Sequence, residues 1–347
     1  MNQPLAYILH SGQMFGTERM ALATLGALRG RFDGLLIAPP GPVHAAARRE
    51  GLASVVAGSR LAVVRAVWRQ LRRHPQSALL TTGVWQSVAG WGLQRLLGGR
   101  GAHLHLVHGG TDERLSYGRK RLLAGLPVRL VAVSDFVRRR LLAHGVPADR
   151  IEVVGNFLPS GPASRRAPFA KDGVRRVLML SRLDRIKRVG LLFDALERTP
   201  GLAALRFDVY GSGEEAAALR ARARRHPNVT LHGFVPDAAA ALASADLLLH
   251  TCPEEPFGLV LLEAFAAGVP VLVPNSGGTG DLVRHGVNGW HFSANDARAL
   301  GQCLLAMARL PASRLNVLVQ GGRRALAEEH DPLRQARRYA LLAGASA

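Results

Sequence analysis

The sequence is poor in several features, and each scarcity excludes a class of protein. Only two cysteines, Cys252 and Cys303, occur in 347 residues, so a disulfide framework is excluded. No run of about 18 apolar residues without charge appears, so we expect no membrane-spanning helix. Residues 1–10 lack the basic region that begins a signal peptide. We therefore expect a cytoplasmic protein.

Lysine and acidic residues are also scarce. Three lysines accompany 42 arginines, and 45 basic residues against 25 acidic ones leave a net charge of +20. Residues 1–160 hold 21 basic and 8 acidic residues, whereas residues 161–347 hold 24 and 17. A GC-rich coding bias explains part of the arginine content but not this uneven distribution. The first half is therefore predicted to face an anionic partner: nucleic acid, an anionic membrane surface or a phosphorylated lipid.

Aromatic residues make up only 5% of the chain, so aliphatic residues must build the core. With 48% hydrophobic residues, the chain is long enough for two domains. Short strand-like runs alternate with helical spacing in both halves, which is typical of parallel sheets covered by helices. The strand-like runs are residues 5–9, 34–38, 79–82, 102–107, 130–133, 177–180, 207–210, 229–231, 247–251 and 269–273.

The alternation stops between residues 156 and 176, where proline, glycine, serine and charged residues dominate. This stretch predicts a linker. The predicted order is a domain at 1–160, a linker at 161–176, a second domain at 177–330 and a basic helix at 331–347. We expect an α/β protein with two facing Rossmann-like, doubly wound parallel sheets and an interdomain cleft, with ligands beyond the carboxyl ends of the strands.

The segment 253–270, PEEPFGLVLLEAFAAGVP, carries the most chemistry. Glu255 and Glu263 are eight residues apart, and Gly258 lies between them where a loop should turn into a helix. Amides at a helix N-terminus suit a phosphate group; here they belong to Phe257, Gly258, Leu259 and Val260. The segment could hold a phosphate on its amides and sugar hydroxyls on its carboxylates. Taken alone, it is equally consistent with two surface carboxylates.

Two further strand-to-helix turns carry useful residues. Arg182 and Lys187 follow the strand at 177–180, where a guanidinium and an ammonium could grip phosphate oxygens. Gly211 and Gly213 permit a tight turn and close approach of a ligand. A solvated basic loop and a plain turn remain the alternatives for these two segments.

Together these segments resemble the retaining glycosyltransferases of family 4, which have the GT-B fold. The most diagnostic family pattern, E-x-F-G-x-x-x-x-E-A, reads here from Glu255 to Ala264, and strand–R-x-x-x-x-K, G-x-G and H-G-F precede it in order. The resemblance covers about residues 4–330 and is stronger in the second half.

The resemblance implies roles for these residues. Glu255 would bind hydroxyls of the donor sugar and Glu263 the ribose, while Arg182 and Lys187 would neutralise the diphosphate, helped by amides near Gly258. It implies a retaining transfer from a nucleoside-diphosphate sugar to a hydroxyl acceptor. No metal and no further cofactor are expected, because no D-x-D motif is placed to hold Mg²⁺ and fixed cations can replace the ion.

The first half matches the family in smaller ways. Its first glycine-rich turn, usually G-G-x-E, is similar to residues 10–22, where Gly16 and Glu18 remain and Gly12 is an alternative close-approach glycine. His108 follows the strand at 102–107 and resembles the family's active-site histidine. A satisfied histidine in a strand-end turn is the alternative, and His103 and His105, which alternate within the strand, are more consistent with structural positions.

The sequence also departs from the family. Arg188 follows Lys187 where glycine is usual, His250-Thr251 stands in place of Pro-Ser, and Asp281 replaces a glutamate. None of these changes removes a charge needed for phosphate binding, but together they leave the donor open.

The basic first half suggests where the acceptor comes from. Leu61, Val64, Trp68 and Leu71 fall on one helical face with arginines interspersed, and a basic cluster follows at 114–121. A basic amphipathic helix can lie on an anionic membrane, although an ordinary surface helix is the alternative. We expect a peripheral membrane enzyme acting on a lipid-linked saccharide or a lipopolysaccharide or exopolysaccharide precursor.

Two other functions are compatible with parts of the sequence. A nucleotide-sugar epimerase of the same fold would consume the donor without an acceptor. A basic nucleic-acid-binding protein should interleave aromatic residues with its basic surface, and the four tryptophans and four tyrosines are scattered. We therefore expect no nucleic-acid partner.

Overall fold

The computed structural model describes residues 2–110, 113–159, 165–235 and 239–345. The chain forms two compact units. The first comprises Met1–Pro159 and His330–Ala347, and the second comprises Ser160–Glu329. The C-terminal helix α14 (Pro332–Leu342) therefore belongs to the first unit, where it contacts α1 (Gly16–Ala27).

The first unit contains a seven-stranded parallel sheet in the order β3-β2-β1-β4-β5-β6-β7. The order reverses at β1, as in doubly wound sheets. The strands are β1 (Gln3–Ile8), β2 (Phe32–Ala38), β3 (Ala53–Val56), β4 (Ala78–Thr81), β5 (His103–Val107), β6 (Arg129–Ala132) and β7 (Ile151–Val153).

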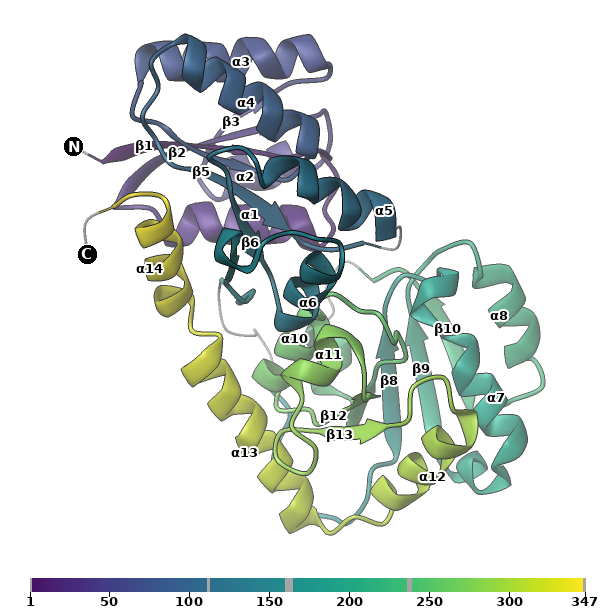
Figure 1. Ribbon diagram of the computed structural model, residues 1–347. Helices are drawn as coiled ribbons and strands as arrows, with labels where there is room; N and C mark the ends of the chain where they lie inside the picture. The colour runs from purple at the N-terminus through teal and green to yellow at the C-terminus, as the bar shows by residue number, and fades with distance from the viewer. Residues whose placement is uncertain (1, 111–112, 160–164, 236–238, 346–347) are drawn as a thin grey trace. The chain divides into compact units, whose positions relative to one another are not determined.

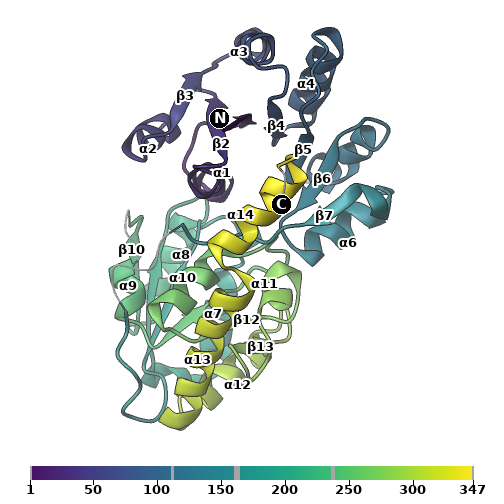
Figure 2. The ribbon, with the colours of Figure 1, turned by 90° about the vertical axis from the view of Figure 1, so that its left-hand side faces the viewer.

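Helices cover both faces of this sheet. Figures 1 and 2 show α3 (Arg60–Arg73) and α4 (Val84–Leu96) side by side on one face and α1 on the other. Apolar side chains of α3 pack on those of β1, β2 and β4. The other helical segments are α2 (Val43–Arg49), α5 (Glu113–Ser116), η1 (Gly118–Leu123), α6 (Asp135–Ala143) and η2 (Ala148–Arg150).

The second unit repeats the plan with six parallel strands in the order β10-β9-β8-β11-β12-β13. The strands are β8 (Arg176–Leu180), β9 (Arg206–Tyr210), β10 (Val229–Gly233), β11 (Leu247–Leu249), β12 (Val271–Pro274) and β13 (Trp290–Phe292). The helical segments are η3 (Arg185–Lys187), α7 (Gly190–Arg198), η4 (Pro200–Ala204), α8 (Ala216–Ala223), α9 (Ala239–Ala243), α10 (Leu259–Ala267), α11 (Gly277–Leu282), α12 (Ala297–Met307) and α13 (Ala312–Glu329).

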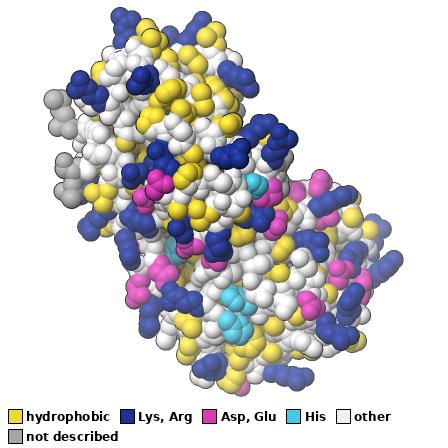
Figure 3. All heavy atoms as spheres, in the orientation of Figure 1, with side chains coloured by type: hydrophobic (Ala, Val, Ile, Leu, Met, Phe, Trp, Pro, Cys, Tyr) yellow, Lys and Arg dark blue, Asp and Glu magenta, His cyan; other side chains and the backbone are white. Residues whose placement is uncertain are grey.

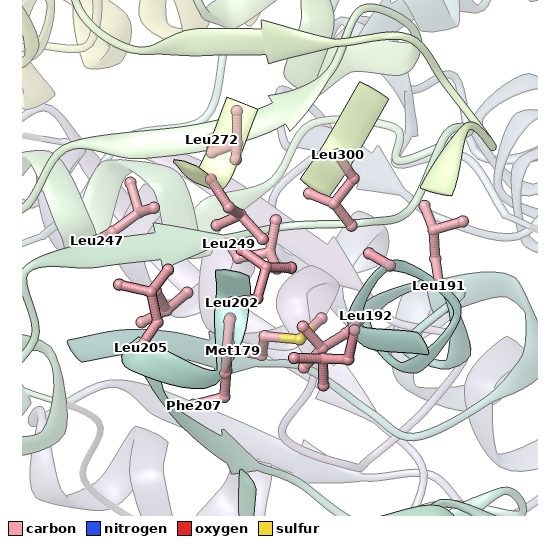
Figure 4. Packing of buried hydrophobic residues seen from close by; sticks show 14 of the residues in the cluster. Met179, Leu191, Leu192, Leu202, Leu205, Phe207, Leu247, Leu249, Leu272 and Leu300 are labelled. Carbon is pink, nitrogen blue, oxygen red and sulfur yellow. The ribbon is translucent and has the colours of Figure 1, made fainter. Parts of the chain in front are cut away.

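One aliphatic core holds the second unit together. Figure 4 shows Met179, Phe207, Leu247, Leu249 and Leu272 projecting from the strands into a layer of leucines from α7, η4 and α12. These strand residues are at most 2% exposed. Complete burial of a leucine or phenylalanine contributes about 1.5–3 kcal/mol to stability. The aliphatic core that the composition predicts therefore stabilises the strands whose carboxyl ends carry the site.

The prediction of two parallel α/β sheets is confirmed. Three strands were not predicted: β3, β7 and β13. Each is an edge strand of three or four residues. Edge strands bury one side only, so they lack the continuous apolar run that marks the central strands.

The predicted linker lies partly outside the described residues, at 161–164. Its described part packs on the second unit. The amide of Phe169 donates to Asn316 Oδ1 (2.9 Å) and the amide of Arg166 donates to the carbonyl of Ala267 (2.8 Å). Phe169 is 6% exposed. These residues therefore extend the second unit toward α10 and α13.

No described helix combines the length and the apolar character that crossing a bilayer requires.

Candidate functional site

The loop between β11 and α10 brings the central acid of the predicted site into the second unit. The chain leaves β11 at Leu249, and α10 begins at Leu259 after Gly258, which has φ +91°. A side chain at Gly258 would place its Cβ 2.7 Å from Thr279 Cγ2. Glycine is therefore required both for the left-handed backbone and for the close packing of α11. This turn sets Glu255 on the loop, as the motif predicts.

Glu255 and Lys187 form a partly buried ion pair. Lys187 Nζ lies 2.5 Å from Glu255 Oε2, and the two side chains are 16% and 14% exposed. Lys187 ends the short helix η3, which follows β8, and Glu255 follows β11. Since β8 and β11 are paired in parallel, the two charges come from the carboxyl ends of neighbouring strands. The sequence predicted both residues at one site but assigned them to different parts of the donor. The structure pairs them directly.

Burial and charge act in opposite directions on this pair. Burial favours the neutral forms, but the Lys187 ammonium and the nearby imidazole of His250 outweigh it and hold the pKa of Glu255 well below its usual range. Burial would likewise lower the pKa of Lys187, but the Glu255 carboxylate raises it above its ordinary value. Both groups are therefore charged at neutral pH.

His250 and Cys252 complete the cluster around Glu255. His250 Nε2 lies 3.4 Å from Glu255 Oε2, and both His250 and Cys252 are buried. One ligand atom from each of His250, Cys252 and Glu255 lies within 4.8 Å of the others. Burial raises the pKa of the Cys252 thiol to about 12. In the sequence His250 stands out only as a departure from the family pattern, and no local pattern assigns a role to Cys252.

The backbone of this loop is tied to its neighbours. The amide of Gly278, in α11, donates to the carbonyl of Glu255 (2.6 Å), and Ser276 Oγ donates to the carbonyl of Pro253 (2.8 Å). Thr251 Oγ1 donates to the carbonyl of Lys187 (2.7 Å). The Glu255 loop is thus held by hydrogen bonds from two sides, which keeps the carboxylate in one place.

Arg182 lies closer to solvent than Lys187. Its side chain is 52% exposed and forms an ion pair with Asp184. Arg182 lies on the same turn after β8 as Lys187. The predicted pair of cations is therefore one buried ammonium and one accessible guanidinium.

Gly211 and Gly213 fold the β9–α8 turn onto the turn that carries Arg182. Gly211 has φ +145°, and a side chain there would overlap the carbonyl of Ser181. A side chain at Gly213 would place its Cβ 2.6 Å from the backbone of Leu183. The protein's own backbone fills the space beside these glycines. In the structure the two glycines therefore allow this turn to pack closely on the turn that carries Arg182.

Glu263 lies on α10, five residues beyond Gly258. It is the half-buried residue in a stretch, 261–267, whose other members are buried. The amides at the start of α10 are those of Leu259 and Val260, as predicted. Since the first four amides of a helix lack acceptors within the helix, they form a partially positive end near Glu255.

The predicted glycine-rich turn of the first unit has an internal structural role. Gly16 begins α1, and the buried carboxylate of Glu18 accepts a hydrogen bond from the amide of Phe15 (3.1 Å). At Gly12 a Cβ would approach the carbonyl oxygens of Pro39 and Pro40 too closely. Gly12 is needed because this loop packs against that backbone.

His108 follows β5 in the first unit, as predicted. Its Nε2 is buried and has no hydrogen-bond partner among the described residues. Burial, assisted by His10, lowers the pKa of His108 to about 4. His10 Nδ1 lies 2.8 Å from Thr82 Oγ1 at the ends of β1 and β4. Two neutral imidazoles therefore lie at the carboxyl ends of β1 and β5, the two strands that flank β4.

His103 and His105 are buried structural residues, as their alternation predicts. Ser87 Oγ lies 2.8 Å from His105 Nδ1, and Gln94 Oε1 lies 3.1 Å from His103 Nδ1. Burial lowers the pKa of His103 to about 4 and takes that of His105 well below its usual range. Lys120, in η1, adds a buried ammonium that lowers the pKa of His105 further. In the sequence Lys120 belongs to the basic cluster at 114–121.

Both halves of the chain match known family models. Residues 16–160 match the model described as Glycosyltransferase Family 4, and residues 174–309 match the model described as Glycosyl transferases group 1.

Curated relatives share part of this chain. A phosphatidyl-myo-inositol mannosyltransferase of Mycobacterium leprae is 33% identical over 190 residues, 52% of this chain and 49% of that protein. The amylovoran biosynthesis glycosyltransferase AmsK of Erwinia amylovora is 28% identical over 194 residues, 52% of this chain and 47% of that protein. The alignments span about half the length of these relatives.

Solved structures are similar over nearly the whole chain. HepE of Anabaena, crystallised with UDP and glucose, superposes with a TM-score of 0.82 at 19% identity and covers 98% of this chain and 99% of that one. The lipopolysaccharide outer core galactosyltransferase WaaB superposes with a TM-score of 0.77 at 18% identity, with the same coverage of both chains. At this level of identity the similarity establishes the fold.

Proposed function

Because this chain belongs to the family 4 and group 1 glycosyltransferases, we propose that it transfers a sugar from a nucleoside-diphosphate sugar to a hydroxyl group of a saccharide acceptor. The observation that carries the proposal is the Lys187–Glu255 pair at the start of α10. It brings a buried cation from the turn after β8 to an ionised carboxylate on the loop that leads into a helix N-terminus. A sugar bonded to a diphosphate needs this combination, because its phosphates are anionic and its sugar presents hydroxyl donors.

The difficult step is departure of the diphosphate while the anomeric carbon gains positive character. Lys187, Arg182 and the first amides of α10 would stabilise the negative charge that develops on the leaving phosphate. Such stabilisation by fixed charges and dipoles is usually the largest single contribution to catalysis. Fixed cations supply here what a divalent ion supplies in other phosphate sites, so we propose that the transfer requires no metal.

Glu255 would orient the donor sugar. An ionised carboxylate only accepts hydrogen bonds, and Oε2 is engaged by Lys187, so Oε1 is the oxygen assigned to sugar hydroxyls. Glu263 would accept hydrogen bonds from the ribose. Both assignments rest on the match between residues 255–264 and the family motif.

Retention of the anomeric configuration is part of the proposal. It follows from the family motif, with a departing phosphate oxygen accepting the proton of the acceptor hydroxyl. His108 is assigned to the donor sugar on the same basis. A pKa near 4 keeps its imidazole neutral, so it would act as a hydrogen-bonding group and not as a cation.

The proposed acceptor is a lipid-linked saccharide or a polysaccharide precursor at an anionic membrane surface. The helix α3 has two apolar rows. Val63, Val67 and Leu71 are buried in the unit, so Leu71 belongs to the core and not to the exposed face that the sequence suggested. Leu61 and Trp68 are 56% and 36% exposed.

Arginines lie beside this exposed row. Arg65 and Arg69 are exposed, and Arg72 lies over the Trp68 ring, with its Cζ 5.0 Å from the ring centroid. On α4, Leu96 is 76% exposed. In Figure 3, yellow hydrophobic side chains lie among dark blue Lys and Arg side chains in the upper part of the molecule, where Figure 1 places α3 and α4. Exposed apolar side chains next to arginines suit the boundary between anionic headgroups and acyl chains.

Two of the three lysines of the chain provide a direct test of the donor site. Lys187→Ala should lower the turnover of the true donor by about 10²–10³, since it removes a cation from the leaving group. Lys171→Ala, at an exposed position, should leave turnover unchanged. Wild-type turnover by Lys187→Ala would refute the site assignment, and so would wild-type turnover by Glu263→Ala. The donor is first identified by thermal shift with a panel of nucleotide sugars, because a ligand that binds the folded state raises its apparent stability.

Vesicle sedimentation tests the membrane proposal. At low salt the protein should bind vesicles of anionic phospholipid more than vesicles of neutral phospholipid, and Leu61→Ser with Trp68→Ser should weaken binding several-fold. The matched control is Leu341→Ser, which removes a leucine that is 55% exposed on α14 of the same unit. Equal retention of wild type on both vesicle types would refute the proposal.

A further inference from the structure

We propose that His250, Cys252 and Glu255 form a binding site for a thiophilic divalent cation of the Zn²⁺ class, and that this cation and the Lys187 ammonium exclude each other at Glu255. The expectation that transfer needs no metal concerns catalysis. The cation proposed here would occupy the loop when the catalytic ion pair is broken.

The three ligand types suit this class of metal. Imidazole nitrogen, thiolate sulfur and carboxylate oxygen are the zinc ligands of proteins, and three protein ligands with one open position are typical of accessible zinc sites. Mg²⁺ and Ca²⁺ prefer sets made of oxygen atoms alone. The cluster therefore selects a softer cation than the ions usually associated with phosphate chemistry.

The distances are close to those of a tetrahedral site. With metal–nitrogen and metal–oxygen bonds of about 2.0–2.1 Å, two tetrahedral ligand atoms lie about 3.3–3.4 Å apart. His250 Nε2 and Glu255 Oε2 are already 3.4 Å apart. Cys252 Sγ completes a set in which one imidazole nitrogen of His250, one carboxylate oxygen of Glu255 and the sulfur lie within 4.8 Å of one another. A tetrahedral nitrogen–sulfur separation is about 3.6 Å, so a side-chain adjustment of about 1 Å closes the site.

His250 carries an independent indication of a ligand. Its side chain is 5% exposed, and within the described ranges its buried Nε2 has no hydrogen-bond partner of good geometry. The contact with Glu255 Oε2, at 3.4 Å, satisfies this buried nitrogen poorly, and a fully unsatisfied buried polar atom costs about 1–3 kcal/mol. A metal bonded to Nε2 would remove this cost, and the atom faces the carboxylate that would share the metal.

Lys187 is the competitor that the structure places at the same oxygen. Its Nζ lies 2.5 Å from Glu255 Oε2, so the ammonium must withdraw before a divalent cation can use this oxygen. Two cations sharing one carboxylate oxygen at this distance would repel each other strongly in a partly buried site. Metal binding therefore removes Lys187 from its position and disables the diphosphate site. This last step rests on the proposed function, whereas the metal site itself does not.

Cobalt spectroscopy tests the site without any assay of transfer. Co²⁺ added to the full-length wild type should give a sulfur-to-cobalt charge-transfer band that Zn²⁺ abolishes, at one ion per chain. The chain has only two cysteines, so the band must arise from Cys252 or Cys303. It should disappear in Cys252→Ser and persist in Cys303→Ser. Absence of the band in wild type, or its loss in Cys303→Ser alone, would overturn the proposal.

Two more variants separate the metal site from a general loss of structure. His250→Leu should raise the Zn²⁺ dissociation constant at least about tenfold, because even outer partners of metal ligands contribute 10–100-fold. Lys187→Met should lower that constant, since the competing ammonium is gone, and a misfolded site cannot bind more tightly. An unchanged or weaker affinity in Lys187→Met would refute the exclusion.

Inhibition of transfer by Zn²⁺ is measured separately, in wild type and in Cys252→Ser. Zinc should inhibit wild type by competition with the donor and should inhibit Cys252→Ser at least about tenfold less strongly. Zinc binding without inhibition would contradict the proposed role of Lys187 in transfer and leave the metal site standing. Inhibition that Cys252→Ser does not relieve would show that zinc acts elsewhere.

Discussion

The two units stabilise their buried polar side chains in different ways. The first holds neutral histidines: His103 and His105 lie within β5, and their pKa values are far below the usual range because of burial. The second holds ions in pairs. Glu255 is paired with Lys187, and Asp208, which is fully buried, is paired with Arg176 Nε (2.6 Å) and His232 Nε2 (2.6 Å).

The difference reflects what each unit contains. The first half has few acids for its many arginines, so its buried strand histidines remain neutral and hydrogen-bond to Ser87, Thr81 and Gln94. The second half has enough carboxylates to match buried cations. A buried ion pair is stable only while both partners are present, whereas a buried neutral histidine is stable only while it is unprotonated. The second unit should therefore be destabilised most by loss of one partner of an ion pair, and the first unit by a fall in pH.

The largest effect is expected from breaking the ion pair of the second unit. Lys187→Met leaves the Glu255 carboxylate buried without its cation, which should lower the free energy of unfolding by about 3–5 kcal/mol. The double variant Lys187→Met with Glu255→Leu should recover most of that loss, because neither charge remains. Urea denaturation measures both.

The matched control is the exposed arginine of the same unit. Arg222 pairs with Asp194 and Glu197, and its side chain is 32% exposed. Arg222→Ala should cost at most about 1 kcal/mol. Equal losses in Arg222→Ala and Lys187→Met would show that the second unit does not depend on its buried pair.

Acid should act first on the first unit. The pKa of His103 is about 4 in the folded chain and about 6.5 in an unfolded one. The unfolded state therefore binds more protons between these values, and stability falls as the pH drops below about 6.5. From pH 7 to pH 5 the loss is about 2 kcal/mol for each such histidine. The depressed pKa of Glu255 removes stability only below about pH 4.3, where its unfolded form begins to protonate.

Hydrogen exchange of the whole chain can separate the two units. After correction for the intrinsic rate, peptides from β4 to β6 should lose protection between pH 7 and pH 5 faster than peptides from β8, β11 and β12. His291 of the second unit also has a lowered pKa, but it is half-exposed and contributes less. His103→Leu should reduce the pH dependence of the first unit. Equal loss of protection in both units would contradict the expectation that acid destabilises the first unit first.

A smaller effect is expected at the glycine that starts α10. Gly258→Ala forces a left-handed conformation on a residue with a Cβ and moves that atom against Thr279, so it should cost about 1–3 kcal/mol. Thermal denaturation would measure the loss. The variant should also weaken donor binding, since Glu255 and the α10 amides move with this turn.

The smallest effect should have the opposite sign. Gly92 lies inside α4 of the first unit, and a Cβ there would meet no atom within 4 Å. Gly92→Ala should therefore stabilise the protein by about 0.5–1 kcal/mol through its helix propensity. Destabilisation by this variant would indicate that a glycine at this position serves a purpose other than local conformation.

The positions of many site residues could be predicted from the sequence because they depend on local patterns. Gly258, Gly268 and Pro270 bracket α10, so the positions of Glu255 on the loop and Glu263 on the helix follow from chain-local rules. The central strands could also be predicted, because each is a continuous apolar run. The edge strands β3, β7 and β13 could not, because half-exposed short segments lack a distinctive period.

The roles of individual glycines and cations needed the structure. The sequence predicts close approach of a ligand at Gly12 and Gly213, and the structure adds that backbone distant along the chain packs beside both glycines. Lys120 belongs to the basic cluster at 114–121, yet it is 9% exposed and lies near His105. No local pattern distinguishes these cases, since each depends on what folds against the residue.

The sequence by itself determined the two α/β units, the order of their central strands along the chain and the loop that carries Glu255, because periodicity and turn residues act within about 20 residues. Only the tertiary structure decided that Lys187 pairs with Glu255 and that His250 and Cys252 surround the same carboxylate. The parallel pairing of β8 with β11 brings residues 68 positions apart to one sheet edge. Charges separated so far along the chain meet only through the sheet, and their mutual attraction is strong only where the fold has removed the water between them.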